Sequence, residues 1–263
     1  MTRVLSGVSS SMTSEEKLLL NRFKDLDRMA LNKNKAFFTN FLDAYEYSLF
    51  LDHVNDFESH TGIYDLIDDL ERQMVFFHPD AFCDSVEFPI TILKIMPKSA
   101  KFKGEISHRD ILGTLMSLQI ERKYIGDIRI QENGEIIVFC VDSVANLIIE
   151  SIDRIRHTDV VISRVENISD FNFCKKFIDK CGSLASNRLD AIVSECFNLS
   201  RSSASDLIKS ECVFVNSKLE NKVTKSIGTN DKISVRKHGK VKITDIGEEN
   251  RKGKIKISYS IYA

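Results

Sequence analysis

The sequence predicts an α+β protein built from three successive domains, at residues 1–80, 81–170 and 183–263. Three observations lead to this prediction: apolar residues at helical spacing in the first part, alternating strand and helix patterns in the middle, and a basic final part with two helices and several short strands. A chain of 263 residues with 43% hydrophobic and 29% charged residues has the composition of a globular protein and can bury such cores.

The amino-terminal domain is predicted to be helical. Ser14 is the expected N-cap, and apolar residues recur at helical spacing over residues 18–29. A second apolar stripe covers residues 37–45, and a third pattern runs from 63 to 77, where Pro79 ends it. We therefore expect helices through this domain, with the aromatic residues in its core.

The central domain is predicted to be ferredoxin-like, with the order βαββαβ. Asn133-Gly134 lies between two β-rich runs and predicts a hairpin. The expected strands are residues 88–96, 125–131, 135–141 and 160–165, and the expected helices are 107–120 and 142–155. RNA-recognition motifs share this fold but carry aromatic side chains on the third strand. That strand reads EIIVFCV here, so this RRM-like sheet is not expected to stack bases.

A linker is predicted over residues 168–186, followed by two helices. The first helix covers 187–197, and Ser200 caps the second. Strands are then expected at residues 212–216, 232–236, 241–246 and 255–259.

Charge is distributed unevenly along the chain. Residues 181–263 contain 15 Lys and Arg against 9 Asp and Glu, a balance of +6, whereas residues 1–80 contain 8 against 14, a balance of −6. A basic terminal segment on a chain with a net charge of −1 indicates a polyanionic partner for that segment.

Four motifs in the final segment support an RNA partner. They are Arg188-Leu189-Asp190, Ser200-Arg201-Ser202-Ser203-Ala204, Val213-Phe214-Val215-Asn216 and Asp231-Lys232-Ile233-Ser234-Val235-Arg236. In this order and at these intervals they resemble the RNA-binding domain named after small-subunit ribosomal protein S-four. Ser217 stands where that domain usually has a turn glycine, and Thr229-Asn230 precedes Asp231 where glycine is usual, so turn geometry is in question at both places.

A helix start with an arginine suits phosphate binding. Free N–H groups and the positive dipole end favour an anion, and a guanidinium binds phosphate through two hydrogen bonds. Such a surface recognises the backbone shape of helical RNA. The candidate RNA-binding residues are Arg188, Ser200, Arg201, Ser202, Lys209, Asn216, Lys218, Lys225, Arg236 and Lys237.

Asp190 suggests one catalytic alternative. Asn187-Arg188-Leu189-Asp190 is similar to the catalytic stretch of pseudouridine synthases, yet the following threonine and glycine are missing. We expect Asp190 to fix the neighbouring arginine or cap the helix. A glycine-rich cofactor loop and the signatures of aminoacylation are also missing, and cysteines and histidines are dispersed. The prediction is a protein that is not an enzyme, without cofactor or metal.

The stretch from Leu93 to Ile128 resembles the central domain of the YlmH family. The matching features are Pro97-Lys98, Lys101-Phe102, His108-Arg109-Asp110, Gly113, Arg122 and Ile125-Gly126-Asp127-Ile128, and Arg251-Lys252-Gly253-Lys254-Ile255 is similar to that family's final hairpin. The resemblance covers roughly residues 80–263. It implies association with the large ribosomal subunit and tRNA, a role in rescuing stalled peptidyl-tRNA in ribosome-associated quality control, and a gene neighbourhood linked to cell division.

Basic residues of the central domain form a second candidate RNA contact, against the alternative of solvent-facing side chains. They are Lys98, Lys101, Lys103, Arg109 and Arg122. Without an apolar run long enough to span a membrane or a secretory signal, the chain is expected to be cytoplasmic. The expected partners are rRNA, tRNA and the large ribosomal subunit, with a division protein as a further possibility. The rival functions are an RNA-modifying enzyme anchored by the terminal domain and a protein-interaction scaffold for cell division.

Overall fold

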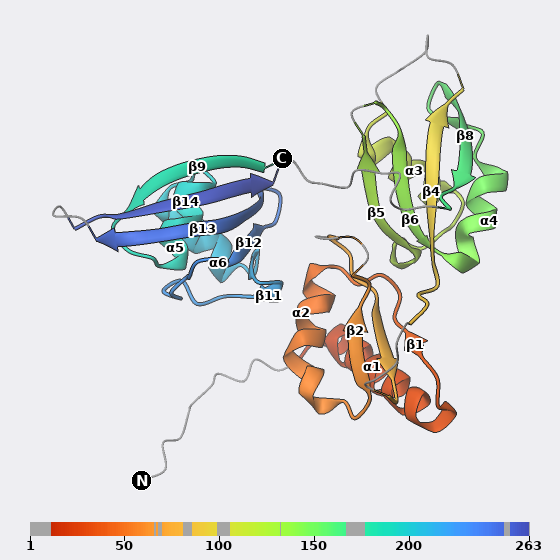
Figure 1. Cartoon of the computed structure of the whole chain (residues 1–263), viewed down its shortest axis with the longest axis horizontal. Helices are drawn as coiled ribbons and strands as arrows, with labels where there is room; N and C mark the ends of the chain where they lie inside the picture. Colours follow the sequence, from red (N-terminus) through yellow and green to blue (C-terminus); the bar gives the residue numbers. More distant parts are fainter. Residues whose placement is uncertain are drawn as a thin grey trace.

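The chain forms three β-sheets with helices packed against them, as shown by a computed structural model (Figure 1). The structure describes residues 12–65, 67, 70–80, 86–98, 106–131, 133–166, 177–249 and 253–262. This mixture of helices and several sheets agrees with the predicted α+β class. The assignment of the sheets to three domains with the predicted boundaries stays a prediction.

The amino-terminal region contains two helices and a small antiparallel sheet with the strand order β1-β3-β2. Its elements are α1 (Ser14–Lys33), β1 (Phe37–Phe38), α2 (Ala44–His53), a 3-10 turn η1 (Val54–Asp56), β2 (His60–Ile63) and β3 (Val75–His78). Both helices begin with a capping box, formed by Thr13 with Glu16 and by Asp43 with Glu46. These caps satisfy N–H groups that have no partner within the helix.

The prediction of an all-helical first domain is wrong at its strands. Residues 37–38 and 75–78 form β-strands, and Thr13 replaces Ser14 as the N-cap of α1. The run Val75–His78 is continuously apolar for three residues and buried on both sides. Apolar periodicity does not distinguish such a short buried strand from a turn of buried helix. The core of this region contains a cluster of four phenylalanine rings, some in edge-to-face contact and some stacked. They are Phe23, Phe50, Phe57 and Phe77.

The central sheet has the strand order β5-β6-β4-β8-β7 and is antiparallel throughout. Its elements are β4 (Ile90–Pro97), α3 (His108–Ser117), η3 (Arg122–Tyr124), β5 (Ile125–Ile130), β6 (Ile136–Val141), α4 (Asp142–Ser151), β7 (Arg154–Ile155) and β8 (Thr158–Arg164). Ser107 caps α3, and Gly134 takes a left-handed φ of 83° in the predicted hairpin turn. The short β7 was not expected, because residues 152–155 continue the apolar pattern of α4.

Helices cover one face of the central sheet, and the opposite face is covered in part, with Met96 and Val161 exposed on it. Helices α3 and α4 share a core with one face through Ile111, Leu115 and Ile148. The opposite face, which includes Ile137 and Phe139, packs against apolar residues of the amino-terminal region. Those residues are Phe41, Tyr64, Ile67, Leu70 and Met74. The surface on which an RNA-recognition motif stacks bases is therefore partly buried in this protein.

Gly126 and Asp127 fix this packing. A Cβ at Gly126 would lie 2.7 Å from the Phe41 ring and 2.9 Å from Cβ of Phe139, so only glycine allows the close approach. The buried carboxylate of Asp127 accepts hydrogen bonds from the backbone N–H groups of Glu71 and Arg72 at 3.0–3.1 Å. The amino-terminal region is thus bound to β5 by apolar packing and by hydrogen bonds.

The carboxy-terminal sheet has six antiparallel strands in the order β11-β10-β12-β13-β14-β9. Its elements are β9 (Phe177–Leu184), α5 (Leu189–Cys196), α6 (Arg201–Lys209), β10 (Val213–Val215), β11 (Lys218–Leu219), β12 (Lys232–Val235), β13 (Gly239–Glu249) and β14 (Ile255–Tyr262). The predicted linker over 168–186 is wrong for residues 177–184, because these pair with β14 over their whole length. The strand reads FIDKCGSL, in which apolar and polar residues do not alternate regularly, so its pattern does not identify it as a strand.

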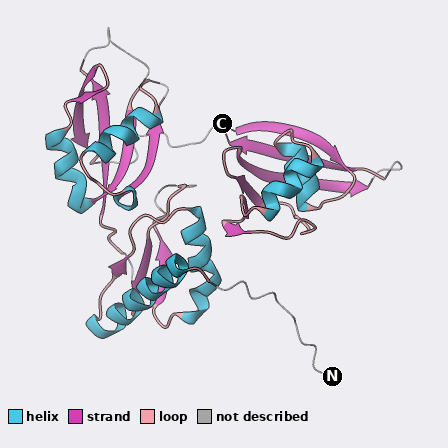
Figure 2. Cartoon of the chain, turned by 180° about the vertical axis from the view of Figure 1, so that it is seen from behind, coloured by secondary structure: helices cyan, strands magenta, loops and turns pink. Residues whose placement is uncertain are grey.

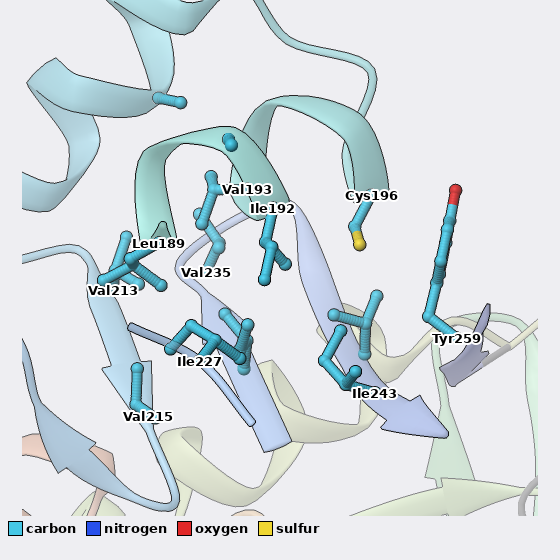
Figure 3. Packing of buried hydrophobic residues seen from close by; sticks show 14 of the residues in the cluster. Leu189, Ile192, Val193, Cys196, Val213, Val215, Ile227, Val235, Ile243 and Tyr259 are labelled. Carbon is cyan, nitrogen blue, oxygen red and sulfur yellow. The ribbon is translucent and has the colours of Figure 1, made fainter. Parts of the chain in front are cut away.

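Helices α5 and α6 cover one face of this sheet (Figure 2). Leu189, Ile192 and Val193 of α5 point toward Val235, Ile243 and neighbouring side chains of the strands (Figure 3). The two helices are therefore held rigidly, and the tip where they meet is a fixed feature of the surface.

Candidate RNA-binding surface

The amino-terminal end of α6 lies at the surface beside α5. Ser200 is the N-cap, and its Oγ accepts a hydrogen bond of 3.0 Å from the N–H of Ser203. Arg201 and Ser202 follow in the first turn, and both are exposed. The cap uses the Ser200 hydroxyl, so an anion at this tip would meet the first-turn amide groups and the Arg201 side chain.

A buried carboxylate joins the two predicted arginines. The Asp190 side chain is 8% exposed and accepts hydrogen bonds from Nε and Nη2 of Arg188 at 3.1 and 3.3 Å. Its Oδ2 also accepts a bond of 2.7 Å from Nη2 of Arg201. The arginine side chains stay 43% and 47% exposed, so each guanidinium has further N–H groups for a ligand. We call Arg188 and Arg201 the arginine pair.

The loop before β12 is hydrogen-bonded to the start of α5, next to the arginine pair. Leu189 and Asp190 donate backbone hydrogen bonds to the carbonyls of Lys225 and Val223, and Arg188 forms a β-bridge with Ser226. Lys225 is therefore beside the arginine pair, with its Nζ 2.7 Å from Glu220. Sequence reasoning placed Arg188, Ser200, Arg201, Ser202 and Lys225 on one surface, and the structure brings these five together.

Other predicted residues lie elsewhere or have a structural role. Lys209 is at the opposite end of α6, about 12 Å along the helix axis from Arg201. The Asn216 side chain bonds Asp231 at 2.8 Å and the N–H of Lys232 at 2.9 Å, which fixes the turn between β10 and β11. Lys237 is exposed in the turn between β12 and β13.

That β10–β11 turn is formed without glycine. Asn216 and Ser217 have φ values of 51° and 67°, as in a type I′ hairpin. Asn230 has a φ of 70° before the next strand. The two departures from the S-four pattern therefore keep the left-handed backbone that glycine usually supplies.

Lys218 and Arg236 contact the amino-terminal region. Nζ of Lys218 lies 3.1 Å from Oδ1 of Asp52 and 3.2 Å from the Leu51 carbonyl at the end of α2. The guanidinium carbon of Arg236 is 5.6 Å from the ring centre of Phe214 and 6.0 Å from that of Tyr45. Both side chains stay exposed despite these contacts, so their predicted role as an RNA-binding rim stays a prediction.

Sequence reasoning did not find this contact between α2 and β11. Ser48 is buried, and its Oγ accepts a hydrogen bond of 2.7 Å from the N–H of Leu219. Tyr45 donates a hydrogen bond to Glu16, which raises the pKa of the tyrosine to about 12. Ser48 and Leu219 are more than 160 positions apart in the sequence, and no local pattern predicts such pairing.

The second candidate contact is only partly assembled. Lys98 and Arg109 are exposed, whereas Arg122 donates hydrogen bonds to the carbonyls of Ile125 and Gly126. Burial lowers the pKa of Arg122, and its side chain serves the turn before β5. Lys101 and Lys103 lie outside the described residues.

Comparison with known proteins finds a similarity to the YlmH family of proteins. Residues 84–169 match the family described as "Putative RNA-binding domain in YlmH". The chain is also 21% identical over 257 residues to "Ribosome-associated protein quality control protein P2" of Bacillus subtilis (strain 168), covering 97% of this chain and 98% of that protein. Over residues 84–169 the chain is therefore similar to the RNA-binding domain of the YlmH family. The YlmH match ends before α5, so the arginine pair lies outside the matched domain.

A solved structure titled "Cell division protein ylmH from Streptococcus pneumoniae" is also similar to this chain. It is 21% identical and has a TM-score of 0.49, covering 63% of this chain and 100% of the solved one. Within the described parts of the chain, no helix is long and apolar enough to cross a membrane. The same residues contain no group of three or more side chains placed to hold a metal ion.

Proposed function

We propose that this protein binds structured RNA, rRNA or tRNA, through the arginine pair and acts on the large ribosomal subunit. Its role would be the rescue of stalled peptidyl-tRNA in ribosome-associated quality control. The match to a YlmH RNA-binding domain and the name of the Bacillus relative support an RNA and ribosome partner. The mechanism is binding by phosphate contacts, without a covalent step or a cofactor.

One observation carries the proposal: Asp190 holds two half-exposed arginines at the tip of α6. A carboxylate that orients two guanidiniums reduces the conformational entropy lost when they bind phosphate. The geometry suits consecutive phosphates of a helical backbone rather than base edges.

The domain arrangement belongs to the same proposal. We propose that α5, α6 and the strands around them work as an S-four-type RNA-binding domain, with β9 added at one edge. The central domain, ferredoxin-like in its element order, contributes RNA contacts only where its surface is exposed, because helices cover one face of its sheet and the amino-terminal region covers part of the other.

A non-catalytic role suits Asp190 better than catalysis. Both oxygens of its carboxylate accept hydrogen bonds from arginines, and the side chain is buried. A carboxylate acting as a nucleophile on RNA needs an accessible oxygen. We therefore propose that the protein is not a pseudouridine synthase or another RNA-modifying enzyme.

Ribosome co-sedimentation tests the proposal. Arg201→Gln should reduce the fraction of protein that sediments with large subunits at low salt, and the difference from wild type should shrink as salt is raised, because the variant makes fewer phosphate contacts. The matched control is Lys222→Gln, which removes the same charge from an exposed position in the same part of the chain. Equal sedimentation of both variants and the wild type would remove the assignment. Sedimentation with division proteins that survives nuclease treatment would favour the scaffold alternative instead.

A further inference from the structure

The carboxy-terminal sheet meets the amino-terminal region through polar groups. The amino-terminal region and the central sheet share an apolar core, in which Phe41 and Met74 pack with Phe139. Within the described residues, the buried core of the carboxy-terminal sheet consists only of residues between Leu184 and Tyr259. This sheet meets the amino-terminal region at β11, which lies beside α2 (Figure 1). The sheet is therefore held to α2 without a shared apolar core.

Two residue pairs hold β11 to α2. The buried Ser48 Oγ accepts a hydrogen bond of 2.7 Å from the N–H of Leu219. Nζ of Lys218 lies 3.1 Å from Oδ1 of Asp52, and these side chains are 49% and 55% exposed. We call these two pairs the α2–β11 contact.

The α2–β11 contact is weak in energetic terms. An exposed ion pair changes an equilibrium constant by a factor of about five at most, and one hydrogen bond contributes a factor of about the same order. Domains that share a large apolar interface are held rigidly, whereas a small polar interface leaves them free to move relative to one another. We therefore expect the contact to open and close in solution.

The contact engages cations that are candidates for RNA binding. Nζ of Lys218 also lies 3.2 Å from the Leu51 carbonyl, so a carboxylate and a carbonyl occupy two of its three N–H donors. Arg236, a second candidate, has its guanidinium carbon 6.0 Å from the ring centre of Tyr45 in α2. Residues 1–80, with a charge balance of −6, thus lie beside cations that phosphate would otherwise contact.

We propose that the α2–β11 contact is autoinhibitory: it closes in the free protein and opens when RNA binds the carboxy-terminal sheet. The inference rests on the proposed RNA-binding function of that sheet. On opening, phosphate replaces Asp52 beside Lys218, and the acidic region moves away from the polyanion. Because RNA binds the open form, its apparent affinity is the intrinsic affinity multiplied by the open fraction.

Amide hydrogen exchange, followed by NMR on the full chain, measures the opening directly. The N–H of Leu219 is bonded to Ser48 across the contact, whereas the N–H of Glu220 is bonded to the Val213 carbonyl within the sheet. A saturating RNA hairpin should speed exchange at Leu219 about fivefold or more and leave Glu220 unchanged. Unchanged or slower exchange at Leu219 in the complex would overturn the proposal.

Variants of α2 test the effect on affinity. Ser48→Ala combined with Asp52→Asn should bind the hairpin about fivefold more tightly in fluorescence anisotropy than the control, because the open fraction rises. The control is Asp56→Asn, which removes the same charge from a carboxylate that is bonded to His53 in the amino-terminal region. Should the double variant fail to fold, Asp52→Asn alone changes an exposed position and should still give a gain of about twofold. Equal affinity of variant and control would overturn the proposal.

The free protein separates this proposal from the RNA-binding one. Without RNA, Asp52→Asn should speed exchange at Leu219 about twofold relative to Asp56→Asn, and equal exchange would overturn the role of the contact. Arg201→Gln should weaken hairpin binding without changing exchange at Leu219 in the free protein. A chain that binds the hairpin with no change at Leu219 would keep the proposed function and lose only the autoinhibitory contact.

Discussion

Asp190 is the residue on which the arginine pair depends, and Asp190→Asn is the substitution that tests it. Asparagine keeps the size of the side chain but removes the charge that both guanidiniums approach at 2.7–3.3 Å. We expect two effects, a loss of folding stability and a loss of RNA affinity, and they can be measured separately.

The stability loss follows from burial. Breaking a fully buried ion pair costs about 3–5 kcal/mol, whereas an exposed pair contributes about 0–1 kcal/mol. The carboxylate is buried but the arginines are 43% and 47% exposed, so water replaces part of the lost interaction. An intermediate loss of roughly 2 kcal/mol in the free energy of unfolding is expected.

The effect on RNA binding has two opposing contributions. Removing a negative charge about 6 Å from a phosphate would improve binding by roughly 0.7 kcal/mol at the dielectric constant of water. Two arginines that must be ordered on binding cost about 0.5–1.5 kcal/mol each. The ordering cost of about 1–3 kcal/mol exceeds this gain by roughly 0.3–2.3 kcal/mol, so affinity for an RNA hairpin should fall by about twofold to fiftyfold.

Chemical denaturation and fluorescence anisotropy measure the two quantities, with Asp206→Asn as the control. Asp206 is an exposed residue of α6. Tighter RNA binding by Asp190→Asn would refute the reasoning, because it would mean that the carboxylate competes with phosphate rather than orienting the arginines. Unchanged stability would refute the assigned hydrogen bonds.

Two further predictions concern packing and thiol chemistry. Gly126→Ala should destabilise the protein by about 1–3 kcal/mol, because its Cβ would overlap the Phe41 ring, and urea denaturation measures this loss. Gly113→Ala is the control: nothing lies within 4 Å of that Cβ in α3, so stability should stay equal or rise. Burial raises the pKa of the Cys140 thiol to about 12, so only about one molecule in ten thousand is thiolate at pH 8. Mass spectrometry after iodoacetamide treatment should find the exposed Cys181 modified before Cys140, which should react only at higher pH or on unfolding; equal rates at pH 8 would contradict the burial.

The contact between α2 and β11 involves two of the predicted RNA-binding cations, Lys218 and Arg236. Lys218 and Arg236 have the charge and position in sequence that an RNA-binding rim requires. In the folded chain Lys218 also contacts Asp52, and Arg236 also lies near Tyr45 of the amino-terminal region. Net charge along a sequence does not reveal which cations are engaged by acids of the same chain.

Local patterns predicted the elements well where one face is buried and the other is exposed. In β12, β13 and α5, apolar residues repeat with the period of the element, and the structure has these elements within a few residues of the predicted bounds. The predictions failed at β3, which is buried on both faces, and at β9, which is exposed on both faces over most of its length. In both cases the spacing of apolar residues carries no information, because the two faces of the strand have the same environment.

The sequence by itself determined the α+β class, the Ser200 helix cap, the Asn133-Gly134 hairpin and the motifs that place Arg188 and Arg201 near a helix start. These features depend on residues close together in the chain, whose hydrogen bonds and spacing are local. Only the tertiary structure decided that Asp190 binds both arginines, that Lys218 contacts α2 and that the amino-terminal region covers part of the central sheet. Those contacts join residues distant in sequence, and which of them form depends on how whole sheets and helices pack.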